Sequence, residues 1–155
     1  MIIKVLENTG YKYDPTYRFF GWEYADQVKP VKECGAENLK EFYLKCNAAW
    51  NIETCSERFR PEWSEEHNRS IGQCTITSAL VNELFGGEVY GIPLEGGGRH
   101  NFNRFDGHSV DLTAEQFGPD TVLDFENAIH VDPATLLSDE DKLSRFNLLK
   151  KRLGL

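Results

Sequence analysis

The chain has 155 residues, enough for about one domain, and its composition, 40% hydrophobic and 27% charged, is typical of globular proteins. The net charge of −8 argues against general nucleic-acid binding, because contacts with phosphates need clustered Lys and Arg. No apolar run is long enough to span a bilayer and no export signal is present, so we expect a cytoplasmic protein without nucleic-acid or membrane partners. We expect residues 1–155 to form a single domain, with an aromatic-rich segment, 1–35, ahead of an α+β core, 36–155.

The first 35 residues alternate aromatic side chains with turn-forming residues. Residues 1–8 favour a first β-strand. Pro15, Gly21 and Pro30 interrupt the aromatic stretch that follows, which favours short strands or an irregular cap and disfavours a helix.

Three helices are predicted from the spacing of apolar residues. The first lies within residues 36–50, and its apolar side chains are Leu39, Phe42, Tyr43, Cys46, Ala49 and Trp50. The second covers residues 74–85 and is stopped by two glycines. The third follows Ser138, expected as its N-cap. Its core-facing residues are Leu143, Phe146, Leu149 and Leu153. Between the first two helices, a polar connection is expected to anchor Trp63 in the core.

A β-hairpin is predicted after a short strand at residues 88–92. The dipeptide Asp106-Gly107 is a strong signal for a two-residue hairpin turn, because both turn positions need a positive φ. Such a turn sets Phe105 opposite His108 and thereby fixes the register of the two strands.

This register places His100 and Asp111 on one face of the hairpin, as diagonal neighbours with Cα atoms about 7–8 Å apart. A carboxylate at that position accepts a hydrogen bond from one ring nitrogen, fixes the tautomer and stabilises the imidazolium. The other ring nitrogen is then available to a thiol.

Cys74 is the candidate thiol. It begins the predicted helix, where the helix N-terminus stabilises a thiolate, the form of cysteine that attacks carbonyl carbon. Gly72 is expected to let a substrate approach the backbone, and the Cys74 N–H together with Gln73 is a candidate oxyanion hole. Two interpretations of Gln73 stay open, because Ser70 and Gln73 also fit a capping box in which Gln73 only satisfies a backbone donor.

The remaining cysteines are expected to be reduced and partly buried: Cys34, Cys46 and Cys55. They form no closely spaced pair, so a zinc site built from them and His67 is a weak prediction. His67, Arg69, Arg99 and Arg104 make the surroundings of the candidate site less acidic than the chain average. Solvated charges are the ordinary interpretation, and the alternative is that they favour a thiolate or an anionic substrate group.

Four segments carry a resemblance to a known family: Ser70-Ile-Gly-Gln-Cys74-Thr-Ile-Thr, Phe85-Gly-Gly, His100-Asn-Phe-Asn and Asp111-Leu-Thr-Ala-Glu-Gln-Phe117. They resemble the YunG-like family of small bacterial proteins, and Trp50 and Trp63 fit that pattern too. The resemblance covers roughly residues 39–125. That family has no established activity, so the resemblance implies no particular reaction.

More distantly, Gly72-x-Cys74, His100-x-Phe102 and Asp111-x-Thr113 resemble the three motifs of transglutaminase-like and papain-like thiol enzymes. That resemblance implies an α+β fold in a papain-like arrangement, with an antiparallel sheet packed against a helix that starts at the cysteine. It also implies Cys74 as nucleophile, His100 as base and Asp111 as the orienting acid. Gly72, Gln73 and Phe102 are then expected to border the oxyanion or substrate-binding region.

Together these features favour a cysteine-dependent hydrolase or acyltransferase. We expect its substrate to be a peptide or another amide-bearing compound, and the reaction to need neither cofactor nor metal. Two alternatives remain open. One is a non-catalytic binding or interaction domain that retains a papain-like fold, and the weaker one is a metal site formed by Cys74, His100 and Asp111.

Overall fold

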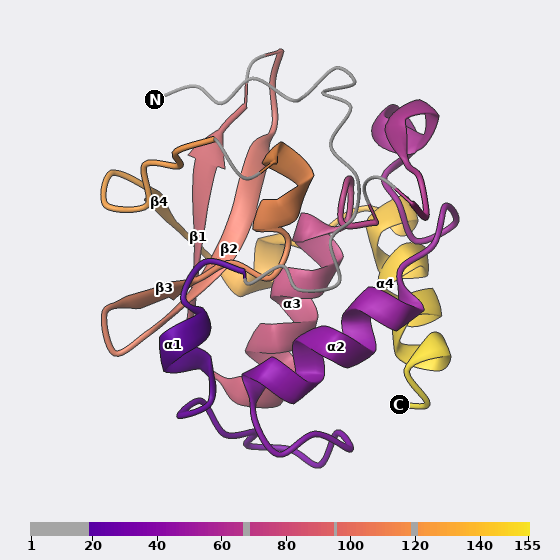
Figure 1. The fold of residues 1–155 in the computed structure, drawn as a ribbon. Coiled ribbons are helices and arrows are strands. Elements are labelled where there is room, and N and C mark those ends of the chain that lie inside the picture. Colours follow the sequence, from indigo (N-terminus) through magenta and orange to yellow (C-terminus); the bar gives the residue numbers. More distant parts are fainter. Residues whose placement is uncertain (1–18, 67–68, 95, 119–120) are drawn as a thin grey trace.

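The fold is seen in a computed structural model that describes residues 19–66, 69–94, 96–118 and 121–155. It is a mixed α+β structure with a four-stranded antiparallel sheet in the order β3-β2-β1-β4. The helices are α1 (Trp22–Ala25), α2 (Leu39–Ala49), α3 (Cys74–Phe85) and α4 (Glu140–Arg152). The strands are β1 (Glu88–Pro93), β2 (Arg99–Phe105), β3 (His108–Val110) and β4 (Ile129–Val131). Three short 3₁₀ helices lie between them: η1 (Glu57–Glu62), η2 (Ala114–Phe117) and η3 (Pro133–Thr135). Helix α3 lies between the sheet and α4 (Figure 1).

Helix α2 confirms the first predicted helix. Asn38 caps it, because its side-chain oxygen accepts the backbone N–H of Glu41 at 3.0 Å. The predicted apolar stripe is buried: Leu39, Phe42, Tyr43, Cys46 and Ala49. Just after the helix, the Trp50 indole donates to the Thr77 hydroxyl at 3.0 Å, which ties the end of α2 to α3.

Helix α3 has the bounds that the sequence predicts and lies against one face of β2. Two asparagines of β2 fix this contact. Asn101 donates to the Thr75 hydroxyl and Asn103 donates to the Ser78 carbonyl, each at 3.0 Å. The first turn of α3 is therefore held in a fixed position beside the start of β2.

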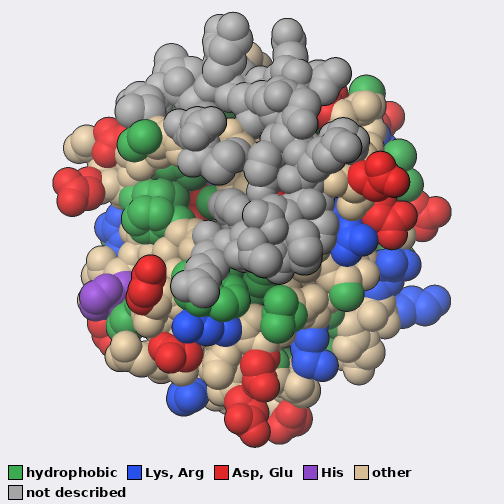
Figure 2. All heavy atoms as spheres, viewed as in Figure 1, with side chains coloured by type: hydrophobic (Ala, Val, Ile, Leu, Met, Phe, Trp, Pro, Cys, Tyr) green, Lys and Arg blue, Asp and Glu red, His purple; other side chains and the backbone are tan. Residues whose placement is uncertain are grey.

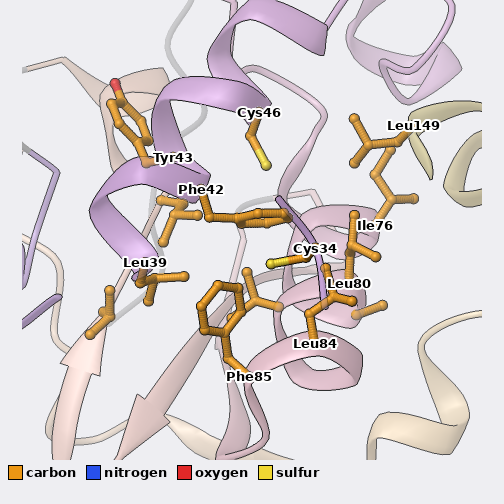
Figure 3. Packing of buried hydrophobic residues seen from close by; sticks show 14 of the residues in the cluster. Cys34, Leu39, Phe42, Tyr43, Cys46, Ile76, Leu80, Leu84, Phe85 and Leu149 are labelled. Carbon is orange, nitrogen blue, oxygen red and sulfur yellow. The ribbon is translucent and has the colours of Figure 1, made fainter. Parts of the chain in front are cut away.

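The main hydrophobic core lies where α2, α3 and the helix-facing side of the sheet meet. Figure 3 shows Phe42 of α2 directed toward Leu80 and Leu84 of α3. A second, smaller cluster includes Ile92, Leu94, Phe102, Phe117 and Phe125. Burial of a large apolar side chain contributes about 1.5–3 kcal/mol to the stability of the fold, so these clusters hold the strands in a fixed position.

The aromatic-rich N-terminal segment is described from residue 19 onward, so the strand predicted at residues 1–8 lies outside the described residues. The expectation that the segment contains no helix is wrong at Trp22–Ala25, which forms one helical turn. Phe19 is buried, with its ring 5.0 Å from that of Trp22 and 4.8 Å from that of Tyr43. This part of the segment therefore belongs to the main core.

Helix α4 begins one residue later than predicted. Asp139, and not Ser138, is its N-cap, and the Asp139 carboxylate accepts a backbone N–H of the first turn at 2.7 Å. Phe146 and Leu149 are buried as predicted. The prediction is wrong for Leu143, which is 45% exposed.

The polar connection between α2 and α3 contains η1, and the Trp63 that follows is only half-buried. Its indole donates to the Arg69 carbonyl at 3.0 Å, which links two parts of the connection to each other. Trp63 therefore does not anchor the connection in the core, contrary to the prediction. Acidic and basic side chains are interspersed over the visible face in Figure 2. No helix in the described part of the chain is long and apolar enough to cross a membrane.

Candidate active site

The hairpin forms with the predicted turn and register. Asp106 has φ 47° and Gly107 has φ 80°, as a two-residue turn requires, and Phe105 lies opposite His108. Because side chains alternate along a strand, this register decides which residues of β2 point toward the second cluster and which point toward α3.

His100 and Asp111 meet, as the register predicts. His100 Nε2 lies 2.5 Å from Asp111 Oδ2, and both side chains are buried. The other carboxylate oxygen accepts the Thr113 backbone N–H at 3.1 Å and the Thr113 hydroxyl at 3.3 Å. The Asp111 backbone N–H donates to the Phe20 carbonyl at 3.0 Å. The carboxylate is thus held in one orientation, with the imidazole fixed against it.

The Cys74 thiol lies against a free edge of β2. Its Sγ is 4.0 Å from the Arg99 carbonyl oxygen, and it accepts a hydrogen bond from the Asn101 backbone N–H. Strand β3 ends at Val110, so among the described residues no strand covers this part of β2 on that side. The sulfur therefore takes the place that a strand backbone would otherwise occupy, beside His100.

The charges of this group support one another. Burial alone would raise the pKa of the Cys74 thiol, but the hydrogen bond and positive charge of His100, followed by the Asn101 N–H and the Thr75 hydroxyl, bring that pKa below its usual value. Burial alone would lower the pKa of His100, but the charge and hydrogen bond of Asp111, with a further contribution from Cys74, raise it to about 10. Both shifts favour a thiolate beside an imidazolium.

The other cysteines differ from Cys74. Burial and the neighbouring Cys34 raise the pKa of the Cys46 thiol. Burial is also the main reason why the pKa of Cys55 is raised to about 12. All four cysteines are unpaired, and Cys74 is the one that is not fully buried. Thiolate character and access to solvent therefore coincide at Cys74.

The two residues before Cys74 are held by protein contacts. Gly72 borders the same cavity as Cys74. Its φ is 70°, and a Cβ there would lie 2.5 Å from Cys55 Sγ and 2.9 Å from the Ser56 nitrogen, so there is no room for a side chain at this position. The Gln73 amide donates to the Asn51 carbonyl at 3.1 Å. Gln73 is itself the N-cap of α3 and makes no side-chain cap bond, so the predicted capping box is wrong. Backbone N–H groups at the start of α3 remain as candidate donors to an oxyanion.

Phe102 is placed away from the thiol. It is buried in the second cluster, with its ring 4.8 Å from that of Phe125, and it does not border the cavity at Cys74. Phe117 of the same cluster packs edge-on against the His100 ring at 4.7 Å. The second cluster thus packs against the imidazole and restricts its movement.

Gln116 is a site residue that was not predicted from the sequence. Its amide nitrogen lies 3.4 Å from His100 Nδ1 and donates to the Thr113 carbonyl and hydroxyl at 3.0 and 3.1 Å. The three-residue spacing from Thr113 to Gln116 across η2 was the available signal. Gln116 also borders the cavity, so it positions the imidazole where a substrate would enter.

Cys74 and Gln116 border a cavity of about 320 Å³. Four cations from three separate segments also line it: Arg58, Arg99, Lys142 and Arg145. No carboxylate lines it within the described residues. Of the three arginines that the sequence placed near the site, only Arg99 borders the cavity, because Arg69 pairs with Glu65 and Arg104 packs on Tyr90.

The cysteines and histidines are not arranged as a metal site in the described part of the chain, where no three potential ligands are grouped to hold an ion. Cys34 and Cys46 lie in the main core, while His67 lies outside the described residues. At the candidate site, His100 uses Nε2 for Asp111, so the two do not face a shared position.

Comparison with known sequences places the chain in a family. The YunG protein family matches residues 38–154, which is most of the chain. The chain belongs to the YunG family. The match begins just ahead of α2 and ends within the last turn of the chain, so it includes Cys74, His100 and Asp111. Searches of curated proteins and of solved structures found no match.

Proposed function

We propose that this YunG-family protein is a cysteine-dependent hydrolase or acyltransferase that acts on an amide bond. The observation that supports this most is the chain of contacts from the Asp111 carboxylate through the His100 imidazole to the Cys74 thiol at the wall of a cavity. The helix that starts at Cys74 packs on an antiparallel sheet that bears His100, with Asp111 directly after β3. This is consistent with a papain-like arrangement, which we include in the proposal.

In this proposal His100 holds the proton of the Cys74 thiol, and the thiolate attacks the carbonyl carbon of the amide. The C–S bond forms as the carbonyl becomes an oxyanion, which backbone N–H groups at the start of α3 stabilise. The C–N bond then breaks, and the imidazolium gives its proton to the departing amine. Water or another amine attacks the resulting thioester, and the thiol is regenerated.

The proposal is tested with p-nitrophenyl acetate, an activated acyl donor that requires no knowledge of the natural substrate. The thiolate displaces p-nitrophenolate and becomes acetylated, and water later releases acetate. We expect release of p-nitrophenolate, with the acetyl group mapped by mass spectrometry to Cys74. Cys74→Ala should abolish the reaction, while Cys34→Ala, which removes a cysteine outside the cavity wall, should leave it unchanged.

The same experiment separates the enzyme from a binding domain that retains the arrangement without the chemistry. Acetylation spread over several lysines and cysteines, with no loss in Cys74→Ala, would contradict the proposed nucleophile. Acetylation of Cys74 that is no faster than that of glutathione at the same pH would favour the binding domain.

A further inference from the structure

The wall of the cavity beside Cys74 has a charge opposite to that of the whole chain. The net charge of the protein is −8, yet the four charged residues that line this cavity within the described residues are all basic. They come from η1, β2 and α4, three segments far apart in the sequence. Such a concentration of one sign in a concave site attracts the opposite charge.

Arg99 places its backbone beside the reacting sulfur. Its own carbonyl oxygen is 4.0 Å from Cys74 Sγ, and its exposed side chain has no hydrogen-bond or ion-pair partner among the described residues. Gly91 on the neighbouring strand makes room for it, since a Cβ there would lie 3.1 Å from Arg99 Cδ. The guanidinium is therefore available to a ligand at the entrance of the cavity.

The other three cations are held in place by protein groups. Arg58 donates to the Gly97 carbonyl at 3.0 Å. Lys142 lies 3.4 Å from the exposed Asp139 carboxylate. Arg145 is buried and pairs with the exposed carboxylate of Asp141 at 2.9 Å. These contacts fix the positions of the charges. The carboxylates paired with Lys142 and Arg145 are exposed, so solvent weakens both ion pairs.

We propose that the cavity binds a small substrate with a carboxylate close to the amide that Cys74 attacks, and that Arg99 and Lys142 recognise this carboxylate. This inference rests on the proposed function, because it takes Cys74 as the reacting group. A carboxylate accepts two parallel N–H bonds from a guanidinium, and peptides and N-acyl amino acids carry one within a few bonds of the amide. The cavity volume, about 320 Å³, is at the lower end for ligand sites and matches such a compound better than an extended chain.

The test compares two alkylating reagents of similar size, the anion iodoacetate and the neutral iodoacetamide. In both, the Cys74 sulfur forms a bond with the CH₂ carbon as the carbon–iodine bond breaks and iodide leaves. The ratio of the two rates at Cys74, divided by the same ratio for glutathione, measures the preference for a carboxylate. We expect a preference of about fivefold, the effect of one unit charge a few ångströms away in a high dielectric.

Arg99→Gln and Lys142→Gln should each lower this preference, and the double variant should bring it close to one. Lys151→Gln is the matched control, because Lys151 is an exposed residue of α4 that does not line the cavity. A preference near one in the wild type would overturn the proposal. A high preference that survives the double variant would also overturn it, since the charge of His100 alone would then explain the effect.

Measurements at pH 6 and pH 9 separate this inference from the proposed function. Slow labelling by iodoacetamide at pH 6 would contradict an activated Cys74, while the ratio at pH 9, where ordinary thiols ionise, still reports on the cations. Protection by succinate and by inorganic phosphate at equal ionic strength identifies the anion. Stronger protection by succinate supports a carboxylate site, and stronger protection by phosphate would contradict it.

Discussion

The His100 imidazole is buried against a carboxylate that cannot turn away. Asp111 is held by its own backbone bond to Phe20 and by two bonds from Thr113, so one of its oxygens stays directed at His100 Nε2. The contact between His100 and Asp111 could be predicted from the sequence alone. A two-residue turn and the alternation of side chains along a strand together determine where two side chains eleven residues apart lie.

Asp111→Asn tests the role of this carboxylate. The amide is of similar size and still accepts the bonds from Thr113, but it carries no charge to stabilise the imidazolium. We expect the pKa of His100 to fall, the pKa of Cys74 to rise, and p-nitrophenolate release at pH 7 to slow by about tenfold or more, which corresponds to one pKa unit or more.

Asp106→Asn is the control for this substitution. It makes the same chemical change in the same hairpin, and asparagine before glycine suits the turn equally well. Its rate should equal that of the wild type. Equal slowing in both variants would mean that the hairpin, and not the charge at Asp111, limits the reaction.

Elements that depend on local chemistry were predicted well. Helices α2 and α3 and the β2–β3 hairpin carry their own spacing, capping and turn residues. The single turn of α1 was missed, because four residues hold no periodicity and packing of Phe19 and Trp22 on Tyr43 accounts for it. The start of α4 was misplaced by one residue because Ser and Asp are both good N-caps and stand side by side.

The turn before α3 determines where Cys74 lies, and Gly72→Ala tests it. Alanine there would adopt a positive φ and bring its Cβ to 2.5 Å from Cys55 Sγ. We expect a loss of unfolding free energy on the order of 3 kcal/mol, from strain and overlap together, measured by urea denaturation.

Gly107→Ala in the turn between β2 and β3 supplies the comparison. Its φ of 80° is similar, but no atom lies within 4 Å of the added Cβ, so only the strain of about 1 kcal/mol is expected. If the two variants lose the same stability, the close contact at Gly72 is not a constraint on the turn.

The cavity is a property of the whole molecule. Its cations come from η1, β2 and α4, and the packing of α3 between the sheet and α4 brings them together. Of these four cations, Arg99 alone was placed near the site from the sequence, because it is adjacent to His100. Arg58, Lys142 and Arg145 could not be assigned, since no local pattern records which distant segments pack around a helix terminus.

The coupled charges of Cys74 and His100 predict how stability depends on pH. The pKa of an ordinary histidine is about 6.5, whereas that of folded His100 is about 10. Between these two pH values folded His100 holds a proton that the unfolded chain has lost. The stabilisation that His100 contributes therefore declines as the pH rises through about 10. Folded Cys74, with its lowered pKa, has lost a proton that the unfolded chain keeps up to about pH 9, so its stabilisation grows as the pH rises toward that value. The two effects oppose each other between about pH 6.5 and 9.

Cys74→Ala removes one of them. The free energy of unfolding of the wild type minus that of the variant should therefore increase from pH 6.5 to 9, by at most about 1.4 kcal/mol per pH unit. Urea denaturation of both proteins at each pH gives this difference. Titrating groups remote from Cys74 cancel from it, and Asp111, which raises the pKa of His100 more than Cys74 does, remains in the variant. A difference that stays constant over this range would show that the thiol has an ordinary pKa in the folded protein.

The rate of alkylation of each cysteine by iodoacetamide, followed from pH 5 to 9 and assigned by mass spectrometry, tests the central claim most directly. If His100 and Asp111 hold Cys74 as a thiolate, Cys74 reacts much faster than Cys34, Cys46 and Cys55 at pH 6, and Asp111→Asn shifts its profile to higher pH. Equally slow reaction of all four cysteines at pH 6, rising together only near pH 9, would contradict the thiolate–imidazolium pair.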